Sequence, residues 1–469
     1  MSAKWIVLKF GGTSVAGRPN WEAIASLARD REAEGFRVLL VCSAVAGVTD
    51  RLNELADRPG GHAGLNEILD LHRALGRELG VREGDWLPPG RALLEECVEA
   101  LRQKPAPAAR AALLAMGEWF STRLGASFIR QQGLDIAWVD AREALEISPE
   151  PELSAARQWL SAGCDARTDR ALSASWSRVG GLLITQGFVA RGPDGRTALL
   201  GRGGSDTSAA LLAGRLEAER LEIWTDVPGL FSADPRLCED ARLLTGVDYA
   251  EALEMAASGA RVIHPRSIRA AAETGTPIVI GDMHRPDIAG TRIGAAVVSG
   301  EGVKGVTCQE EMAVMLLQNL DARRQVGFLA AVFAVFRRHG VSIDLVATSE
   351  TTTTVALNKA ANHLDAEGLD ALDSDLRQHC TVDRFDDCVC VNLVGRGART
   401  ALSKLAGVMR FFDDHPLLMV SQSANDLCLS LLVPAGGYPT LIRSAHAALI
   451  PPAPDSVFGV AWQQLRAAG

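Results

Sequence analysis

The stretch "WIVLKFGGTS", residues 5 to 14, decides how the chain begins to fold. Its first six residues are mostly apolar and predict a buried strand, which Gly11 and Gly12 end. A helix is expected from Asn20, and "RVLLVCSA" (37–44) predicts a second buried strand. Strand, helix and strand in this order indicate a parallel βαβ unit, so the chain is expected to start as an α/β layered domain.

The same alternation continues to about residue 298. Apolar runs at 182–190, 221–229 and 276–283 predict further strands, and apolar residues three and four apart predict a helix over 108–131. The first 298 residues are therefore expected to form one domain with a mainly parallel sheet between helical layers.

The rest of the chain has a different order of predicted elements, in which a unit of roughly 70 residues occurs twice. Each unit reads strand, helix, strand, strand, and the helix of the second is expected over 400–415. We expect one domain over 299–385 and another over 386–469. The strand 303–308 is expected to pair with the tail 456–462, so that it would belong to the second of these domains.

Composition limits the possible partners. The 469 residues are 47% hydrophobic and carry a net charge of −9, which argues against a nucleic acid or an anionic membrane as partner. No apolar run approaches the ~18 residues of a membrane span, and no signal region begins the sequence. Nine cysteines without a CxxC pair indicate reduced thiols, and a cytoplasmic location is expected. No HExxH spacing supports a protein-bound metal.

Two stretches carry features of an anion site. Lys9 stands directly before the Gly11–Gly12 turn, where backbone N–H groups can approach a phosphate. In "LLGRGGSDTSAALLAG" (199–214), Arg202 and two glycines precede a helix that Ser205 or Asp206 would cap. A simple N-cap explains one of these polar residues, but leaves the arginine and the glycines without a role.

Two other positions are less specific. Thr225 and Asp226 end a strand before a Pro-Gly turn, where open α/β sheets bind ligands, although Asp226 is equally suited to a plain turn. Glu118 lies on an apolar helix, where it is either a solvated residue or a contact for substrate.

Taken together, these stretches resemble the aspartate kinases of the amino-acid kinase superfamily. The resemblance rests on six ordered motifs that span nearly the whole chain, and the double repeat resembles the family's two C-terminal ACT regulatory domains. The motifs are "VLKFGGTS" (7–14), "VCSAVAGVT" (41–49), "GEWFST" (117–122), "GRGGSDTSAALLA" (201–213), "TDVPGLFSADPR" (225–236) and "SGARVIHP" (258–265).

The resemblance implies a three-layer αβα kinase domain followed by two βαββαβ, ferredoxin-like ACT domains. It implies ATP-dependent phosphorylation of the L-aspartate β-carboxylate, the first step toward lysine, threonine and methionine, with Mg²⁺ held mainly by the nucleotide. Catalysis would fall to Lys9 and Asp206, and the residues that would hold aspartate are Thr49, Glu118, Arg202 and Ser205. The nucleotide contacts would be Lys9, Gly11, Gly12, Thr225, Asp226, Phe231, Asp234, Arg236 and Arg261, where Phe231 replaces the usual tyrosine and Arg261 the usual lysine.

The run "GFLAAVFAVFRRHGVSIDLVATSE" (327–350) resembles the effector segment of the lysine-inhibited type. Lysine inhibition and self-association through the ACT domains, as a homodimer or a dimer of dimers, are expected on this basis. The effector site would be lined by Gly327, Phe328, Leu329, Ser342, Ile343, Asp344, Ser349 and Glu350.

Two alternatives stay open at this stage. The chain could be another amino-acid kinase of the same fold, or a non-catalytic ACT-type sensor of amino acids. Some family members are fused to homoserine dehydrogenase or diaminopimelate decarboxylase, and this chain could be the kinase part of such a fusion.

Overall fold

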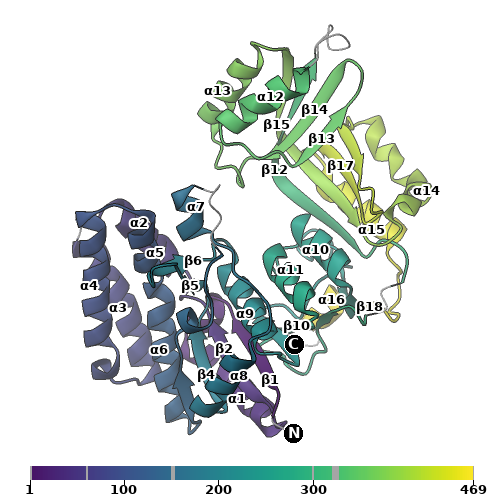
Figure 1. The fold of residues 1–469 in the computed structure, drawn as a ribbon. Coiled ribbons are helices and arrows are strands. Elements are labelled where there is room, and N and C mark those ends of the chain that lie inside the picture. Colours follow the sequence, from purple (N-terminus) through teal and green to yellow (C-terminus); the bar gives the residue numbers. More distant parts are fainter. Residues whose placement is uncertain (1–2, 60–61, 149–153, 298–299, 319–326, 468–469) are drawn as a thin grey trace. The chain divides into compact units, whose positions relative to one another are not determined.

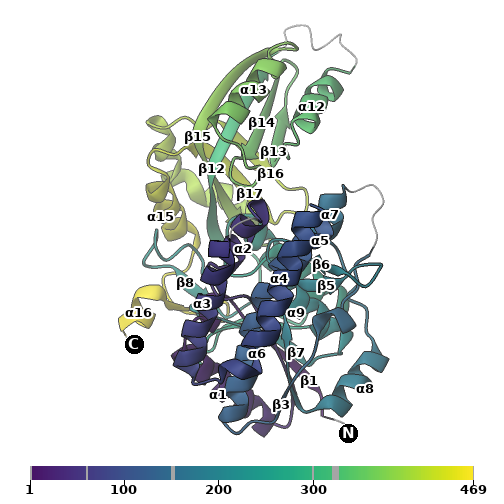
Figure 2. The same cartoon turned by 90° about the vertical axis from the view of Figure 1, so that its left-hand side faces the viewer.

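The computed structural model describes residues 3–59, 62–148, 154–297, 300–318 and 327–467. Contacts between Cα atoms divide the chain into two compact units, which Figures 1 and 2 trace from two sides. Unit 1 comprises Met1–Leu230, Thr245–Leu253 and Arg261–Val298, and unit 2 comprises Phe231–Leu244, Glu254–Ala260 and Ser299–Gly469.

Unit 1 is built on an eight-stranded sheet whose order is β3-β4-β2-β1-β7-β10-β11-β9. The first six strands in this order are parallel, and β11 runs antiparallel to β10. The mainly parallel α/β fold expected from the sequence is confirmed. The strands are β1 (Trp5–Phe10), β2 (Arg37–Cys42), β3 (Ile136–Trp138), β4 (Leu182–Gln186), β7 (Arg220–Thr225), β9 (Gly246–Val247), β10 (Ile278–Asp282) and β11 (Thr291–Ile293), with a separate hairpin of β5 (Val189–Arg191) and β6 (Thr197–Leu199).

Helices cover both faces of this sheet. The helices α1 (Arg18–Ala33) and α6 (Met116–Gln131) pack against β2, β3 and β4, whereas α9 (Gly204–Arg215) contacts β1 and β7 and packs against α11 (Pro265–Thr274). The other helices in this part of the chain are α2 (Val48–Asp57), α3 (His62–Leu79), α4 (Leu87–Gln103), α5 (Pro107–Leu114), α7 (Ala155–Leu160), α8 (Arg170–Val179) and α10 (Tyr249–Ala257). None of the described helices is both long and apolar enough to cross a bilayer.

Two expected elements of unit 1 are interrupted. The helix expected over 108–131 is two helices, α5 and α6, which meet at Ala115 because α5 packs on α4 and α7 while α6 packs on the sheet. The strand expected over 182–190 is broken between β4 and β5, where Phe188 has a φ of 67°.

Unit 2 contains one antiparallel sheet of six strands in the order β13-β14-β12-β15-β17-β16. Its first half has the chain order strand, helix, strand, strand, helix, strand, and the strand arrangement of a ferredoxin-like unit. The elements of unit 2 are β12 (Gly305–Gln318), α12 (Phe328–Arg338), β13 (Leu345–Thr348), β14 (Thr352–Asn358), α13 (Ala366–Leu376), β15 (Thr381–Val394), α14 (Ala401–Lys404), β16 (Met419–Gln422), β17 (Cys428–Pro434), α15 (Tyr438–Leu449), β18 (Phe458–Ala461) and α16 (Trp462–Ala467), together with β8 (Arg242–Leu244).

The pairing expected for the tail is wrong. The segment Gly305–Gln309 pairs with Cys390–Val394 of the second repeat, and the tail strand β18 pairs instead with β8. The Arg242 guanidinium fixes the tail there, since it donates to the carbonyl oxygens of Pro451 and Gly459 at 2.9 Å each. Residues far apart in the sequence thus determine the partner of β18.

The prediction of one continuous helix over 400–415 is also wrong. Only the four residues of α14 are α-helical, and short 3₁₀ segments follow. Gly407 lies inside this stretch and lowers its helical propensity, and the N–H of Val408 donates to Leu405 three residues back.

The core of unit 1 depends on close approach between α1 and α6. The Trp21 side chain of α1 is fully buried and donates from Nε1 to the Val15 carbonyl at 3.1 Å. Its ring lies against Gly125 of α6, where an added Cβ atom would come within 2.0 Å of the ring. Gly125 is therefore required by the space that Trp21 occupies.

We expect Gly125→Ala to lower the free energy of unfolding by roughly 1–3 kcal/mol, because overpacking against Trp21 outweighs the better helix propensity of alanine. Urea unfolding measures the change. Gly84→Ala is the matched control, since no atom lies within 4 Å of a Cβ added there. Equal stability of Gly125→Ala and the parent would contradict this account of the packing.

Candidate functional site

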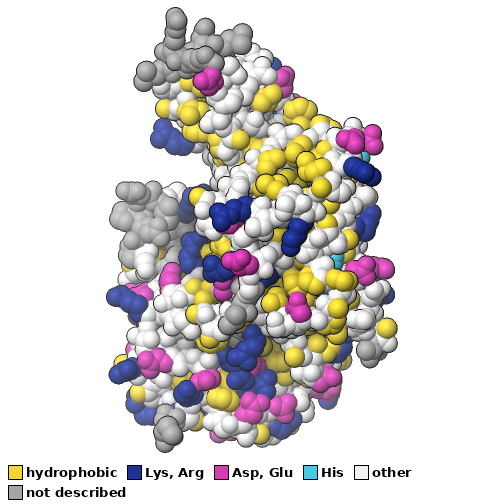
Figure 3. All heavy atoms as spheres, turned by 90° about the vertical axis from the view of Figure 1, so that its right-hand side faces the viewer, with side chains coloured by type: hydrophobic (Ala, Val, Ile, Leu, Met, Phe, Trp, Pro, Cys, Tyr) yellow, Lys and Arg dark blue, Asp and Glu magenta, His cyan; other side chains and the backbone are white. Residues whose placement is uncertain are grey.

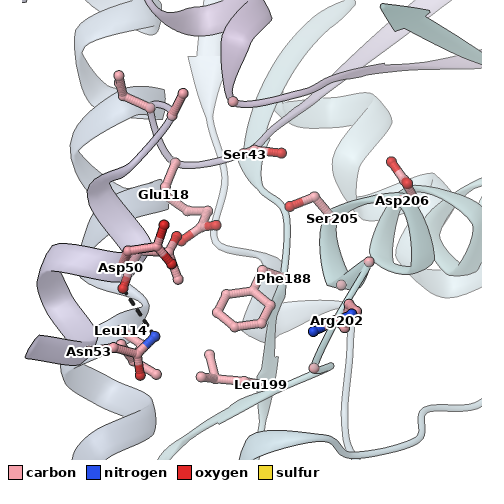
Figure 4. Close-up of a pocket in the computed structure, with 18 of the residues that line it drawn as sticks. Ser43, Asp50, Asn53, Leu114, Glu118, Phe188, Leu199, Arg202, Ser205 and Asp206 are labelled. Atoms are coloured by element: carbon pink, nitrogen blue, oxygen red, sulfur yellow. Dashed lines mark hydrogen bonds between the residues drawn. The ribbon is translucent and has the colours of Figure 1, made fainter. Parts of the chain in front are cut away.

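A cavity of about 670 Å³ opens in unit 1 where the ends of β1 and β2 meet the starts of α2, α6 and α9. Figure 4 shows that Glu118 and Ser205 project into it from opposite sides. The cavity brings together seven residues that the sequence analysis singled out, namely Lys9, Gly12, Thr49, Glu118, Arg202, Ser205 and Asp206.

Lys9 and Asp206 form an ion pair within this cavity. Lys9 comes from β1 and Asp206 from the first turn of α9, and their side chains are only 12% and 15% exposed. Lys9 points to the face of the sheet that α9 covers, since its side chain reaches Asp206 of that helix. The pair therefore joins the end of the central strand to the start of the helix beside it.

The start of α9 is shaped to receive an anion. The first backbone N–H that bonds within the helix is that of Thr207, so those of the three residues before it have no helical acceptor. Gly203, the N-cap, has a φ of 66°, and an added Cβ would lie 2.2 Å from the His264 ring. Glycine is thus needed here both for the backbone angle and for the close approach of α11. Arg202 precedes this turn and adds a full positive charge.

Glu118 is the buried acid of the cavity, with a side chain 3% exposed. Burial raises the pKa of its carboxyl to about 8, although backbone N–H groups of Ala44 and of Glu118 itself lower it in part. Its Oε2 atom has no hydrogen-bond partner among the described residues. A buried acceptor left without a partner costs free energy, so the site is suited to a cationic group that would ionise this carboxyl.

The turn after β1 and the loop after β2, which also line the cavity, approach each other closely. A Cβ at Gly12 would lie 2.9 Å from the Ala44 carbonyl oxygen, and the Ala46 N–H donates to Gly12 at 3.1 Å. The glycine allows the turn after β1 to contact the loop after β2 directly.

The structure adds lining residues that sequence reasoning missed. Asp50 and Asn53 follow Thr49 on α2, and Arg110 of α5 donates to the side chains of Asn53 at 2.7 Å and Asp57 at 2.5 Å. Asn53 lies four positions after Thr49, so helical spacing could have suggested it, whereas Asp50 at the next position carried no such signal. Arg110 carried no such signal, because its place in the cavity depends on how α5 packs.

Phe188 is a further residue that was missed. It lines the cavity in the left-handed region of backbone space, which is rare for an aromatic residue. Its N–H donates to Ser208 Oγ at 2.9 Å, and a Cβ at Gly204 would lie 2.4 Å from its ring. The ring is therefore clamped against the start of α9.

Lys9 and Gly12 line this cavity, but the other residues implied for nucleotide binding do not. Thr225 and Asp226 lie at and after the end of β7, where the Thr225 hydroxyl donates to the Asp226 carboxylate at 3.0 Å. Arg261 is exposed on the surface of unit 1. Phe231, Asp234 and Arg236 belong by their contacts to unit 2, where Asp234 pairs with Arg236 at 2.6 Å and the Phe231 ring packs edge-on against Trp462.

Unit 2 holds its own cavity of about 320 Å³ between the start of α12 and the turn from β13 to β14. Five of the eight residues expected at an effector site line it: Gly327, Phe328, Leu329, Ser349 and Glu350. Ser342, Ile343 and Asp344 are not part of its lining; the Asp344 carboxylate accepts from the Asn358 N–H at 2.7 Å. Burial raises the pKa of Asp344.

The chemistry of the cavity in unit 1 suits a ligand with both signs of charge. Lys9, Arg202 and the free N–H groups of α9 attract oxyanions, whereas Glu118 attracts a cation. Among the described residues, no group of three or more His, Cys, Asp or Glu side chains is placed to hold a metal ion.

Comparison with known proteins gives consistent matches. A model of the amino acid kinase family matches residues 4–282. The chain is 30% identical to the lysine-sensitive aspartokinase 3 of Escherichia coli (strain K12) over 458 residues, which cover 95% of this chain and 99% of the relative.

Solved structures extend this similarity. The E. coli aspartokinase III in complex with aspartate and ADP (R-state) matches with a TM-score of 0.78 and 28% identity, over 96% of this chain and all of the other. The same enzyme in complex with lysine and aspartate (T-state) matches with a TM-score of 0.79 and 28% identity, over 95% of this chain and 99% of the other.

The buried acid gives a prediction about stability and pH. The pKa of Glu118 is about 8 in the fold against its usual 4.5, so the folded protein resists its ionisation and loses stability as the pH rises from 4.5 to about 8. Glu118→Gln removes this effect. We expect the variant to become more stable relative to the parent as the pH rises. The difference between their free energies of unfolding should grow by on the order of 1 kcal/mol per pH unit across that window.

Urea unfolding at several pH values without ligand measures this gain. Glu67→Gln, at an exposed position of α3, is the control and should follow the parent at every pH. A constant difference between Glu118→Gln and the parent would show that this carboxyl ionises normally.

Proposed function

The chain belongs to the amino acid kinase family, and on that premise we propose that it is an aspartate kinase. It transfers the terminal phosphoryl group of ATP to the β-carboxylate of L-aspartate and forms 4-phospho-L-aspartate. The observation that carries this assignment is the meeting of Lys9, Arg202 and Glu118 around one cavity.

Each of these groups has a counterpart on L-aspartate. Arg202 can bind the α-carboxylate through two parallel hydrogen bonds, and Ser205 and Thr49 line the same cavity. Glu118 can accept from the α-ammonium group, which would supply the partner that its Oε2 lacks among the described residues. The β-carboxylate is then directed toward Lys9.

Phosphoryl transfer to a carboxylate needs little covalent help from the protein. The carboxylate is already ionised at neutral pH, so no strong base is required, and the rate depends on alignment and on neutralising the phosphoryl oxygens. Lys9 supplies that positive charge, and its pairing with Asp206 holds the ammonium group in place before the substrates bind.

ATP is the phosphoryl donor in this proposal, since the related E. coli enzyme was solved with ADP. Mg²⁺ would be held mainly by the nucleotide phosphates, where it neutralises charge on their oxygens. The nucleotide contacts stay assigned by family resemblance, as do the domain boundaries at 298 and 385. Those contacts are Lys9, Gly11, Gly12, Thr225, Asp226, Phe231, Asp234, Arg236 and Arg261.

We expect Lys9→Ala to lower kcat by a hundredfold or more, because the charge that develops on the phosphoryl group loses its nearest cation. A hydroxamate assay with ATP and L-aspartate measures the acyl phosphate formed. Lys104→Ala, at an exposed position just after α4, is the charge-matched control and should retain full activity.

Near-normal turnover of Lys9→Ala would refute this role of the lysine. A parent protein that produces no hydroxamate would instead favour a non-catalytic sensor of amino acids.

The second half of the chain is proposed to regulate the first. The cavity at the start of α12 would receive lysine, with Ser349 and Glu350 as polar contacts and Phe328 against its aliphatic chain. The related E. coli enzyme was solved with lysine, which supports the same effector here. The two repeats would act as ACT domains, and self-association through them is part of this proposal.

We expect lysine to inhibit the kinase activity and threonine to leave it unchanged. Ser349→Ala should raise the lysine concentration for half inhibition severalfold, because a hydroxyl at the cavity is lost. Ser403→Ala, at an exposed serine of α14, is the control in the same assay. Inhibition by threonine alone, or no response to lysine, would reject the effector assignment.

A further inference from the structure

Unit 1 has a second cavity at the opposite end of its sheet. It has a volume of about 320 Å³ and lies at the amino-terminal ends of β7 and β10, beside α1 and β11. Three arginines line it, Arg31, Arg220 and Arg292, together with Glu219 and Glu222. None of these residues takes part in the kinase site described above.

The strand register separates this cavity from the catalytic one. Glu222 stands opposite Val279, and Val279 stands opposite Arg292, so the three side chains form one row on one face of the sheet. Lys9 is in register with Ile223 and points to the other face. Along β7, Arg220 precedes Thr225 by five residues, which is roughly 16 Å of strand.

The two carboxylates of the cavity are already neutralised. Glu222 is 2% exposed, and its Oε1 accepts from Arg31 Nε at 2.8 Å and from Arg220 Nε at 2.7 Å. Its Oε2 accepts from Trp224 Nε1 at 3.0 Å. Glu219 is paired with Lys4 at 2.6 Å. These contacts fix the two arginines rigidly around a buried anion.

Arg292 takes no part in these ion pairs. It lies at an exposed position of β11, and among the residues that the structure describes its guanidinium has no hydrogen bond or ion pair. A purely structural ion-pair cluster accounts for Arg31 and Arg220, which hold Glu222, but it gives Arg292 no role. The cavity therefore presents an uncompensated guanidinium beside two that are held in place.

We propose that this cavity binds the oxyanion group of a small metabolite, either a phosphate or a carboxylate. Arg292 is the main contact, because its five N–H donors are available and form a planar fork that matches such groups. Arg31 and Arg220 line the cavity beside it, where ion pairs with Glu222 and Glu34 balance their charges and fix their positions. In Figure 3, Lys and Arg side chains gather, with acidic ones beside them, on the lower half of the face drawn.

The test measures binding of two probes to the full chain at constant ionic strength. Inorganic phosphate is followed by ³¹P line broadening, and succinate by saturation-transfer NMR. All variants carry Lys9→Ala and Arg202→Gln, which remove two cations of the catalytic cavity. Because no turnover is measured, the result does not depend on the kinase assignment.

Arg292→Gln is expected to raise the Kd of the bound probe at least tenfold. Since the side chain is exposed and makes no contact that the fold needs, the variant should unfold at the temperature of its parent. Arg178→Gln is the matched control, because it removes the same charge from an exposed position at the end of α8 and should change Kd less than twofold.

Binding of phosphate alone, or of succinate alone, that Arg292→Gln weakens supports the proposal and names the ligand class. Equal affinity of the Arg292→Gln and Arg178→Gln variants would overturn it, and so would the absence of binding by both probes at millimolar concentration.

Discussion

The ion pair between Lys9 and Asp206 is the interaction on which the large cavity of unit 1 depends. It joins the end of β1, the strand at the centre of the parallel sheet, to the first turn of α9. A charge that is mostly removed from water requires a partner, and here each of the two charges is the partner of the other. The pair thereby fixes a cation beside the free N–H groups of the helix, which makes this end of the sheet attractive to phosphate.

The remaining features of the cavity follow from close backbone approach. Gly12 lets the turn after β1 contact the loop after β2, and Gly203 lets α11 approach the start of α9. Glu118 is buried at the start of α6, and this burial raises its pKa to about 8. The site is therefore preorganised at a cost to stability, and a bound ammonium group would offset that cost by ionising the acid.

Unit 2 shows how a repeat in sequence becomes a single structure. The two repeats share one six-stranded sheet, because β12 and β15 are each long enough to pair along both halves. The segment before the first repeat completes the second half of the sheet by pairing with Cys390–Val394. The tail strand lies apart from this sheet, since Arg242 binds its backbone carbonyl groups beside β8.

The sequence by itself determined the parallel α/β order and the internal repeat, because apolar periodicity is a local signal. Glycine-rich turns and the start of a helix singled out Lys9, Gly12, Arg202, Ser205 and Asp206 of the cavity, whereas Thr49 and the substrate role of Glu118 came from the family resemblance. Only the tertiary structure decided that Phe188 and Arg110 line the cavity, that Glu118 loses contact with water, and that β18 pairs with β8. Each of these depends on which segments distant in the sequence pack together. Burial and strand pairing are set by such long-range contacts, which no local pattern of residues encodes.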